Sequence, residues 1–118
     1  MLEKENEYYE QLFISDLAVI YEIYVTQLRI KGINPYDKNL SSKKTSSDKD
    51  KDAIIFVSNI FKTIMSLSED EKLIIDFEFF HRQYSSWWIT RYSLIEYRNL
   101  YKDAVHTFYT RYLENEKY

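Results

Sequence analysis

The chain has 118 residues, enough for one domain, and 45% of them are apolar, so a hydrophobic core can form. It contains no cysteine, which excludes disulfides, thiolate nucleophiles and cysteine-bound zinc. Its net charge of −3 differs from that of a strongly basic nucleic-acid-binding protein.

No apolar run is long enough to cross a membrane, since a spanning helix needs about 18 such residues. The acidic start of the chain is also unlike a signal peptide. We therefore expect a cytoplasmic protein that makes no membrane contact.

The first predicted element is a long helix over about residues 3–30, because its apolar residues recur at helical spacing. They form two stripes, one of Tyr9, Phe13, Ile20, Tyr24 and Leu28 with Leu17 beside it, and one of Ile14, Tyr21 and Val25. A helix that is apolar on two faces lies at the centre of its fold or packs against another subunit. Gly32 and Pro35 are typical of a helix end.

Residues 36–50 are polar and rich in Ser and Lys, so we expect a loop. Two interpretations of this loop remain open, a passive linker and a basic arm that touches a phosphate backbone. A second helix follows over about residues 50–65. Its predicted apolar face consists of Ile54, Val57, Phe61 and Ile64, flanked by Phe56 and Ile60.

The rest of the chain is predicted to form three more helices. Ser68 and the acidic residues after it predict the start of a third helix, which continues to about residue 82. After a break at residues 84–86, a short fourth helix is expected around residues 87–91. Ser93 and Glu96 fit a capping box, which predicts a last helix that ends near residue 114.

The predicted fold class is therefore all-α with about five helices in a single domain, residues 1–118. Residues 1–65 would form an N-terminal helical pair with its polar loop, and residues 66–118 a helix-turn-helix-like part. For Trp87 and Trp88, two interpretations remain: packing at the helix corner, or an exposed surface for a protein partner.

The sequence contains no pattern typical of catalysis. His81 and His106 lack a second ligand at metal-binding spacing, and Gly32 is a lone glycine, so no glycine-rich phosphate loop exists. The carboxylates cluster where helix starts favour them. We therefore expect neither an enzyme, nor a metal site, nor a cofactor.

The C-terminal half has the order of a helix-turn-helix protein, with a capped last helix after a short helix and a turn. The stretch SLSEDEKLIIDFEFF resembles the opening of the region-four-like helix-turn-helix of bacterial sigma factors. The stretch YSLIEYRNLYKDAVHTF is similar to the recognition helix of ArpU-type phage transcription regulators and of small uncharacterised mollicute proteins. The matching positions are Ser93, Tyr97, Arg98, Ala104, Val105 and Phe108, and the resemblance spans about residues 66–113.

This resemblance implies a DNA-binding transcription regulator whose last helix enters the major groove. The candidate DNA-binding residues are Arg91, Ser93, Leu94, Ile95, Arg98, Asn99 and Lys102. Arg98 and Lys102 lie four residues apart and so share a face that suits phosphates, whereas Leu94 and Ile95 suit thymine methyl groups. Because Glu96 lies among them and phosphates repel a carboxylate, we expect weak, backbone-dominated binding.

Charge along the chain fits either of two partners. Residues 82–118 carry six positive and four negative side chains, although the whole chain is acidic. The alternative function is a helical protein–protein interaction module, either a homodimer or a protein that docks on a partner such as RNA polymerase. The two-faced first helix and the many aromatic residues support this alternative, because Tyr and Trp are enriched at interfaces.

Overall fold

The structure is a computed structural model that describes residues 2–36 and 48–116, the side chains of residues 2–5 excepted. These residues form four α-helices and one π-helical turn, with no strand among them, so the predicted all-α class is confirmed. The elements are α1 (Leu2–Ile30), α2 (Asp48–Met65), α3 (Glu69–Ile75), the π turn η2 (Asp76–Phe80) and α4 (Leu94–Glu116). None of these helices is long and apolar enough to cross a bilayer.

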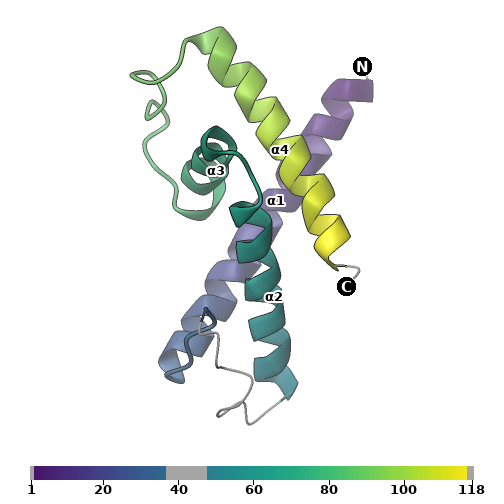
Figure 1. The fold of residues 1–118 in the computed structure, drawn as a ribbon, viewed down its shortest axis with the longest axis vertical. Helices are drawn as coiled ribbons and strands as arrows, with labels where there is room; N and C mark the ends of the chain where they lie inside the picture. Colours follow the sequence, from purple (N-terminus) through teal and green to yellow (C-terminus); the bar gives the residue numbers. More distant parts are fainter. Residues whose placement is uncertain (1, 37–47, 117–118) are drawn as a thin grey trace.

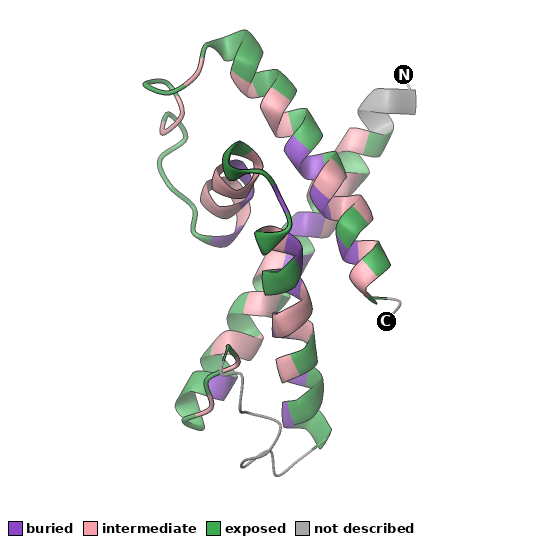
Figure 2. Cartoon of the chain, in the orientation of Figure 1, coloured by how far each residue is buried: buried purple, intermediate pink, exposed green. Residues whose placement is uncertain are grey.

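The arrangement is centred on the crossing of the two longest helices (Figure 1). α1 and α4 cross near the middle of the molecule, and α2 runs beside the C-terminal half of α1. α3 packs against α4, and η2 packs against α1. The buried residues gather around this crossing, whereas the start of α4 extends away from it and is largely exposed (Figure 2).

The core combines side chains from every helix. Its fully buried members include Ile14 of α1, Ile60 of α2, Ile74 and Ile75 of α3, and Phe108 of α4. A smaller cluster holds the far ends of α1 and α2 together through Leu28, Ala53 and Val57.

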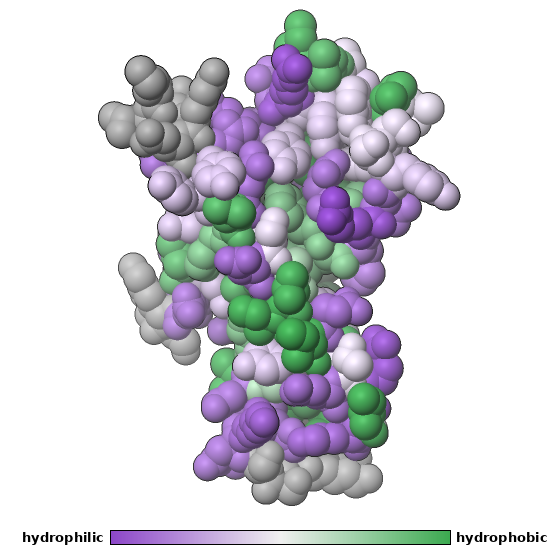
Figure 3. All heavy atoms as spheres, turned by 180° about the vertical axis from the view of Figure 1, so that it is seen from behind, coloured by the Kyte–Doolittle hydropathy of each residue, from purple (hydrophilic) through white to green (hydrophobic). Residues whose placement is uncertain are grey.

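Both predicted stripes of α1 contribute to these clusters, but two members of the first stripe do not. Tyr9 is 65% exposed and Ile20 is 39% exposed. Other apolar side chains on the same side of α1 are exposed as well. Hydrophobic residues accordingly gather in the middle of the surface over α1 (Figure 3).

Gly32 ends α1 as its position in the sequence predicts. Its φ of 74° is in the left-handed region, and its N–H donates to the carbonyl of Arg29 at 3.0 Å. The N–H of Ile33 donates to the carbonyl of Leu28 at 2.8 Å, and the Ile33 side chain packs on Leu28. This pair of hydrogen bonds is a Schellman motif.

The predicted loop at residues 36–50 is shorter at its C-terminal end, because α2 begins at Asp48. Asp48 and Asp50 suit the positive start of the α2 dipole, and Asp50 also bonds Lys31 Nζ at 2.6 Å. That ion pair joins the end of α1 to the start of α2. Both interpretations of the loop concern residues 37–47, which lie outside the described part of the chain.

Two expectations for the C-terminal half need correction. The third helix does not continue as an α-helix to residue 82, because its last turn widens into η2 and ends at Phe80. This turn directs three phenylalanines to different aromatic partners: Phe77 to Trp87, Phe79 to Tyr101, and Phe80 to Tyr21 and Phe108.

The short fourth helix expected around residues 87–91 is also wrong, so the described chain has four α-helices rather than about five. Residues 85–91 form successive turns, with the N–H of Trp87 donating to Tyr84 and that of Arg91 to Trp88. A helix of about five residues forms few backbone hydrogen bonds, and these hardly offset the entropy lost when its first turn is ordered. Here the indole of Trp88 also bonds the Ser85 carbonyl at 3.0 Å, which fixes a local turn instead.

Candidate functional site

A cluster of aromatic side chains anchors the connection between η2 and α4. At its centre, Glu78 accepts a hydrogen bond from Trp87 Nε1 at 2.8 Å and another from the Tyr97 hydroxyl. Trp88 stacks on Tyr97 with ring centroids 4.5 Å apart and planes 7° apart. The Trp87 ring meets Phe77 edge-on at 5.0 Å. Both tryptophans are half-buried, so packing at the corner describes them better than an exposed partner surface.

Two tyrosines of this region, Tyr92 and Tyr97, act as hydrogen-bond donors. Burial and the hydrogen bond to Glu78 raise the pKa of Tyr97 well above its usual range, so its hydroxyl keeps its proton. Tyr92 donates to Asp70 Oδ1 at 2.6 Å, and burial together with this bond raises the pKa of Tyr92 to about 12. The hydrogen bond from Tyr97 to Glu78 joins α4 to η2. The hydrogen bond from Tyr92 to Asp70 joins the end of the connection to the first turn of α3.

The start of α4 has the predicted capping box. Ser93 Oγ accepts from the Glu96 N–H at 3.2 Å, and Glu96 Oε1 accepts from the Ser93 N–H at 3.0 Å. These hydrogen bonds lower the pKa of Glu96, whose carboxylate is turned back onto the cap. Ser93 therefore has a structural role at this helix start, and the charge of Glu96 is partly offset by the backbone.

All seven candidate DNA-binding residues are exposed: Arg91, Ser93, Leu94, Ile95, Arg98, Asn99 and Lys102. At about 100° per residue, Ile95, Arg98, Asn99 and Lys102 lie within one sector of α4 about 100° wide. We call these four residues the α4 face. Arg91 lies outside the helix, in the preceding turn, and Leu94 lies at the edge of the face.

Acidic residues border this face. A shallow hollow of about 490 Å³ is lined by Glu7, Glu78, Tyr97, Arg98, Asn99, Tyr101 and Lys102. Burial, then Glu78 and Glu7, raise the pKa of Tyr101 to about 12. Sequence reasoning missed Glu7, because only the crossing of α1 and α4 brings residues so far apart in the chain together.

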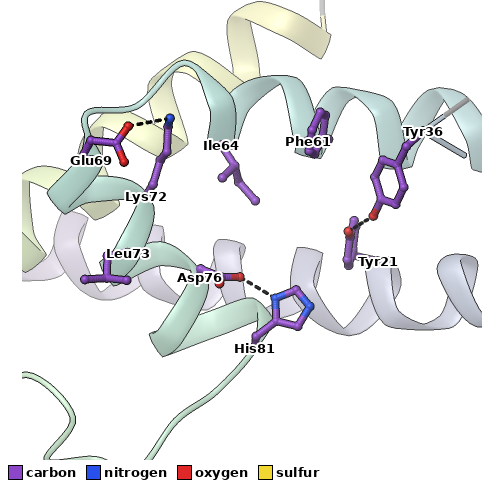
Figure 4. Close-up of a pocket in the computed structure, with 9 residues that line it drawn as sticks. All are labelled: Tyr21, Tyr36, Phe61, Ile64, Glu69, Lys72, Leu73, Asp76 and His81. Carbon is purple, nitrogen blue, oxygen red and sulfur yellow. Dashed lines mark hydrogen bonds and ion pairs between the residues drawn. The ribbon is translucent and has the colours of Figure 1, made fainter. Parts of the chain in front are cut away.

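A second candidate site lies between α1, α2 and α3 (Figure 4). It is an open cleft of about 410 Å³, with an Asp76–His81 pair at 2.5 Å and a Lys72–Glu69 pair at 3.2 Å. On the opposite wall, the hydroxyls of Tyr21 and Tyr36 bond to each other.

The Asp76–His81 pair was not expected from the sequence. A separation of five residues places two side chains on different sides of an α-helix, but the i→i+5 geometry of η2 brings them together. The two side chains share a hydrogen bond, yet the residues that line the cleft include no serine, threonine or cysteine as a nucleophile. Among the described residues, no group of three or more His, Cys, Asp or Glu side chains could hold a metal ion.

Comparison with known proteins adds no relative: no protein-family model, no curated protein and no solved structure matches this chain.

Proposed function

We propose that this protein is a DNA-binding transcription regulator that inserts the start of α4 into the major groove. The observation that carries the proposal is the α4 face, where Arg98, Asn99 and Lys102 lie exposed beside Ile95 on a capped helix start. In this proposal, α3, the connection and α4 act as a helix-turn-helix-like unit in which successive turns replace the short helix. The resemblance of residues 66–113 to sigma-like and ArpU-type sequences supports the same role.

Each residue of the α4 face has a chemical role in this proposal. Arg98 and Lys102 bind phosphates, with Arg91 in the preceding turn as a third cation. Asn99 presents an amide, which pairs with the edge of adenine. Ile95, 74% exposed, and Leu94, 49% exposed, contact thymine methyl groups. These preferences together favour A·T-rich DNA.

The anchors described above supply the rigidity that such contacts require. A helix that contacts bases must keep its register, and here Glu78 and Asp70 hold the segment immediately before and within the start of α4. The bordering carboxylate of Glu7 weakens the attraction to phosphates, so we propose modest affinity with a large electrostatic share.

The test is a titration of a labelled A·T-rich duplex, followed by fluorescence anisotropy at several salt concentrations. We expect binding that weakens steeply with salt, and the Arg98→Glu/Lys102→Glu variant should lose about two units of the log–log salt slope. The matched control is Lys51→Glu/Lys62→Glu, which changes the net charge equally at exposed positions on α2. Equal loss of binding in both variants would mean that net charge, and not the α4 face, is responsible.

A second candidate function is a protein–protein interaction module, which docks on a partner such as RNA polymerase without DNA. The exposed apolar side chains along α1 favour it, because surfaces of this kind mark interaction sites. A chain that binds no duplex even at low salt would support this second function over the first.

A further inference from the structure

One side of α1 exposes a regular row of apolar side chains. Tyr9, Leu12, Val19, Ile23 and Ile30 are between 44% and 80% exposed. With the exposed polar residues Asp16 and Thr26, they recur at alternating intervals of three and four residues. This is the a/d pattern of a coiled-coil helix, and we call these seven residues the α1 seam.

The α1 seam lies on the side of the helix that faces away from the rest of the fold. At about 100° per residue, its centre is roughly opposite Ile14, Leu17 and Leu28, which pack into the two core clusters. Figure 3 shows hydrophobic residues gathered on the surface over α1. An apolar row of this length in water is unfavourable unless another surface covers it.

The surface beside the seam has room for a second helix. A hollow of about 650 Å³ lies between α1 and η2, and Val19 and Ile23 of the seam line it together with Phe79. Side chains of a neighbouring helix that packs along the seam would fill part of this hollow.

We propose that the α1 seam binds the α1 seam of a second copy of this chain, with the two helices antiparallel. In one register, which pairs residues 12–30 and leaves Tyr9 outside the contact, every apolar position meets an apolar position and every polar position meets a polar one. Leu12 lies opposite Ile30 of the second copy, Val19 opposite its Ile23, and Asp16 opposite its Thr26, each pair occurring twice about the two-fold axis.

Charge complementarity selects the antiparallel direction. The antiparallel direction sets Asp16 of each copy opposite Thr26 of the other. Arg29 lies one turn beyond Thr26 beside the seam, so Asp16 is also close to Arg29 of the other copy. A parallel pair would instead bury Asp16 against Asp16 of the second copy at an a position. The antiparallel register has one like-charge contact, between the two Glu22 side chains near the two-fold axis.

The pairing covers residues 12–30 of both copies, which is about 27 Å of helix. This is short for a stable interface, so we expect a dimer that dissociates at micromolar concentrations. The inference depends on α1 alone and goes beyond the proposed DNA binding by α4.

Sedimentation equilibrium over a range of concentrations tests the pairing. We expect the mass to rise from 14.4 kDa towards twice that value, and Val19→Glu/Ile23→Glu should remain a monomer. The matched control is Ile55→Glu/Met65→Glu, which adds the same two charges at positions of α2 that are 58% and 53% exposed and lie off the seam. Circular dichroism of each variant shows whether the fold is kept.

Charge variants test the direction and the register. Asp16→Lys should weaken the dimer about three- to tenfold by placing Lys beside Arg29 of the second copy, and Arg29→Glu should do the same. Asp16→Lys/Arg29→Glu restores opposite charges and should recover dimerisation, whereas Glu22→Gln should strengthen it. Failure of the double variant to recover would overturn the antiparallel register.

Two results separate this inference from the proposed function. Arg98→Glu/Lys102→Glu should leave the dimer unchanged, because the α4 face is not part of the seam. A wild-type chain that stays monomeric at about 0.5 mM overturns the second copy as the occupant, even if it binds DNA. A different protein would then cover the seam.

Discussion

Glu78 connects two residues that the chain places 9 and 19 positions after it, since it accepts from the Trp87 indole and from the Tyr97 hydroxyl. We expect Glu78→Ala to lower the free energy of unfolding by about 1–3 kcal/mol, because both donors lose a charged acceptor. Urea titration followed by tryptophan fluorescence measures this change. Glu114→Ala, at an exposed position of α4, is the control and should have little effect; equal losses in the two variants would contradict the anchoring role.

The burial of Tyr101 makes the free energy of unfolding depend on pH. Burial raises its pKa from 10.0 to about 12, so the folded state holds the proton more tightly than the unfolded state does. Its contribution to stability is therefore complete below pH 10 and is lost as the pH rises towards 12. We expect Tyr101→Phe to flatten the fall in unfolding free energy over this interval, as measured by urea titrations at several pH values. Tyr84→Phe, at a site 86% exposed, should leave the slope unchanged.

The elements differ in how far the sequence determines them. Gly32, the Ser93–Glu96 pair and the periodicity of α1 are local signals, and the structure has a Schellman end, a capping box and a 29-residue helix at these positions. The turns at residues 85–91 and the π turn η2 could not be predicted, because they depend on where Trp87 and the phenylalanines of η2 find partners. The positions of Glu78 and Glu7 beside α4 could not be predicted either, because tertiary packing brings these residues to α4.

At the element scale, Gly32 provides a clean test of helix termination. A Cβ at this position would meet no atom within 4 Å, so only the positive φ opposes a side chain. We expect Gly32→Ala to cost about 1 kcal/mol, and Gly32→Asn to cost less because asparagine tolerates the left-handed region. Thermal unfolding measured by circular dichroism gives both values. Equal costs for the two variants would contradict the conformational explanation.

At the scale of the whole molecule, the two surfaces that we propose to bind partners lie on different helices. The α4 face combines cations, an amide and an apolar contact at one end of the fold, and the α1 seam is an apolar row on another helix. The candidate residues of α4 were predicted from the sequence, because a capped helix start and a charge pair four residues apart are local features. The α1 seam was not predicted, since its apolar residues other than Tyr9 lie in neither of the two stripes expected from the sequence.

Binding of DNA by the start of α4 can be followed residue by residue in an NMR titration of the full chain with an A·T-rich duplex at low salt. Backbone amide shifts report both whether DNA binds and where it binds. We predict that the largest changes fall on residues 91–102, with little change along the α1 seam. An unchanged spectrum, or changes that cluster away from α4, would contradict DNA binding by the start of α4.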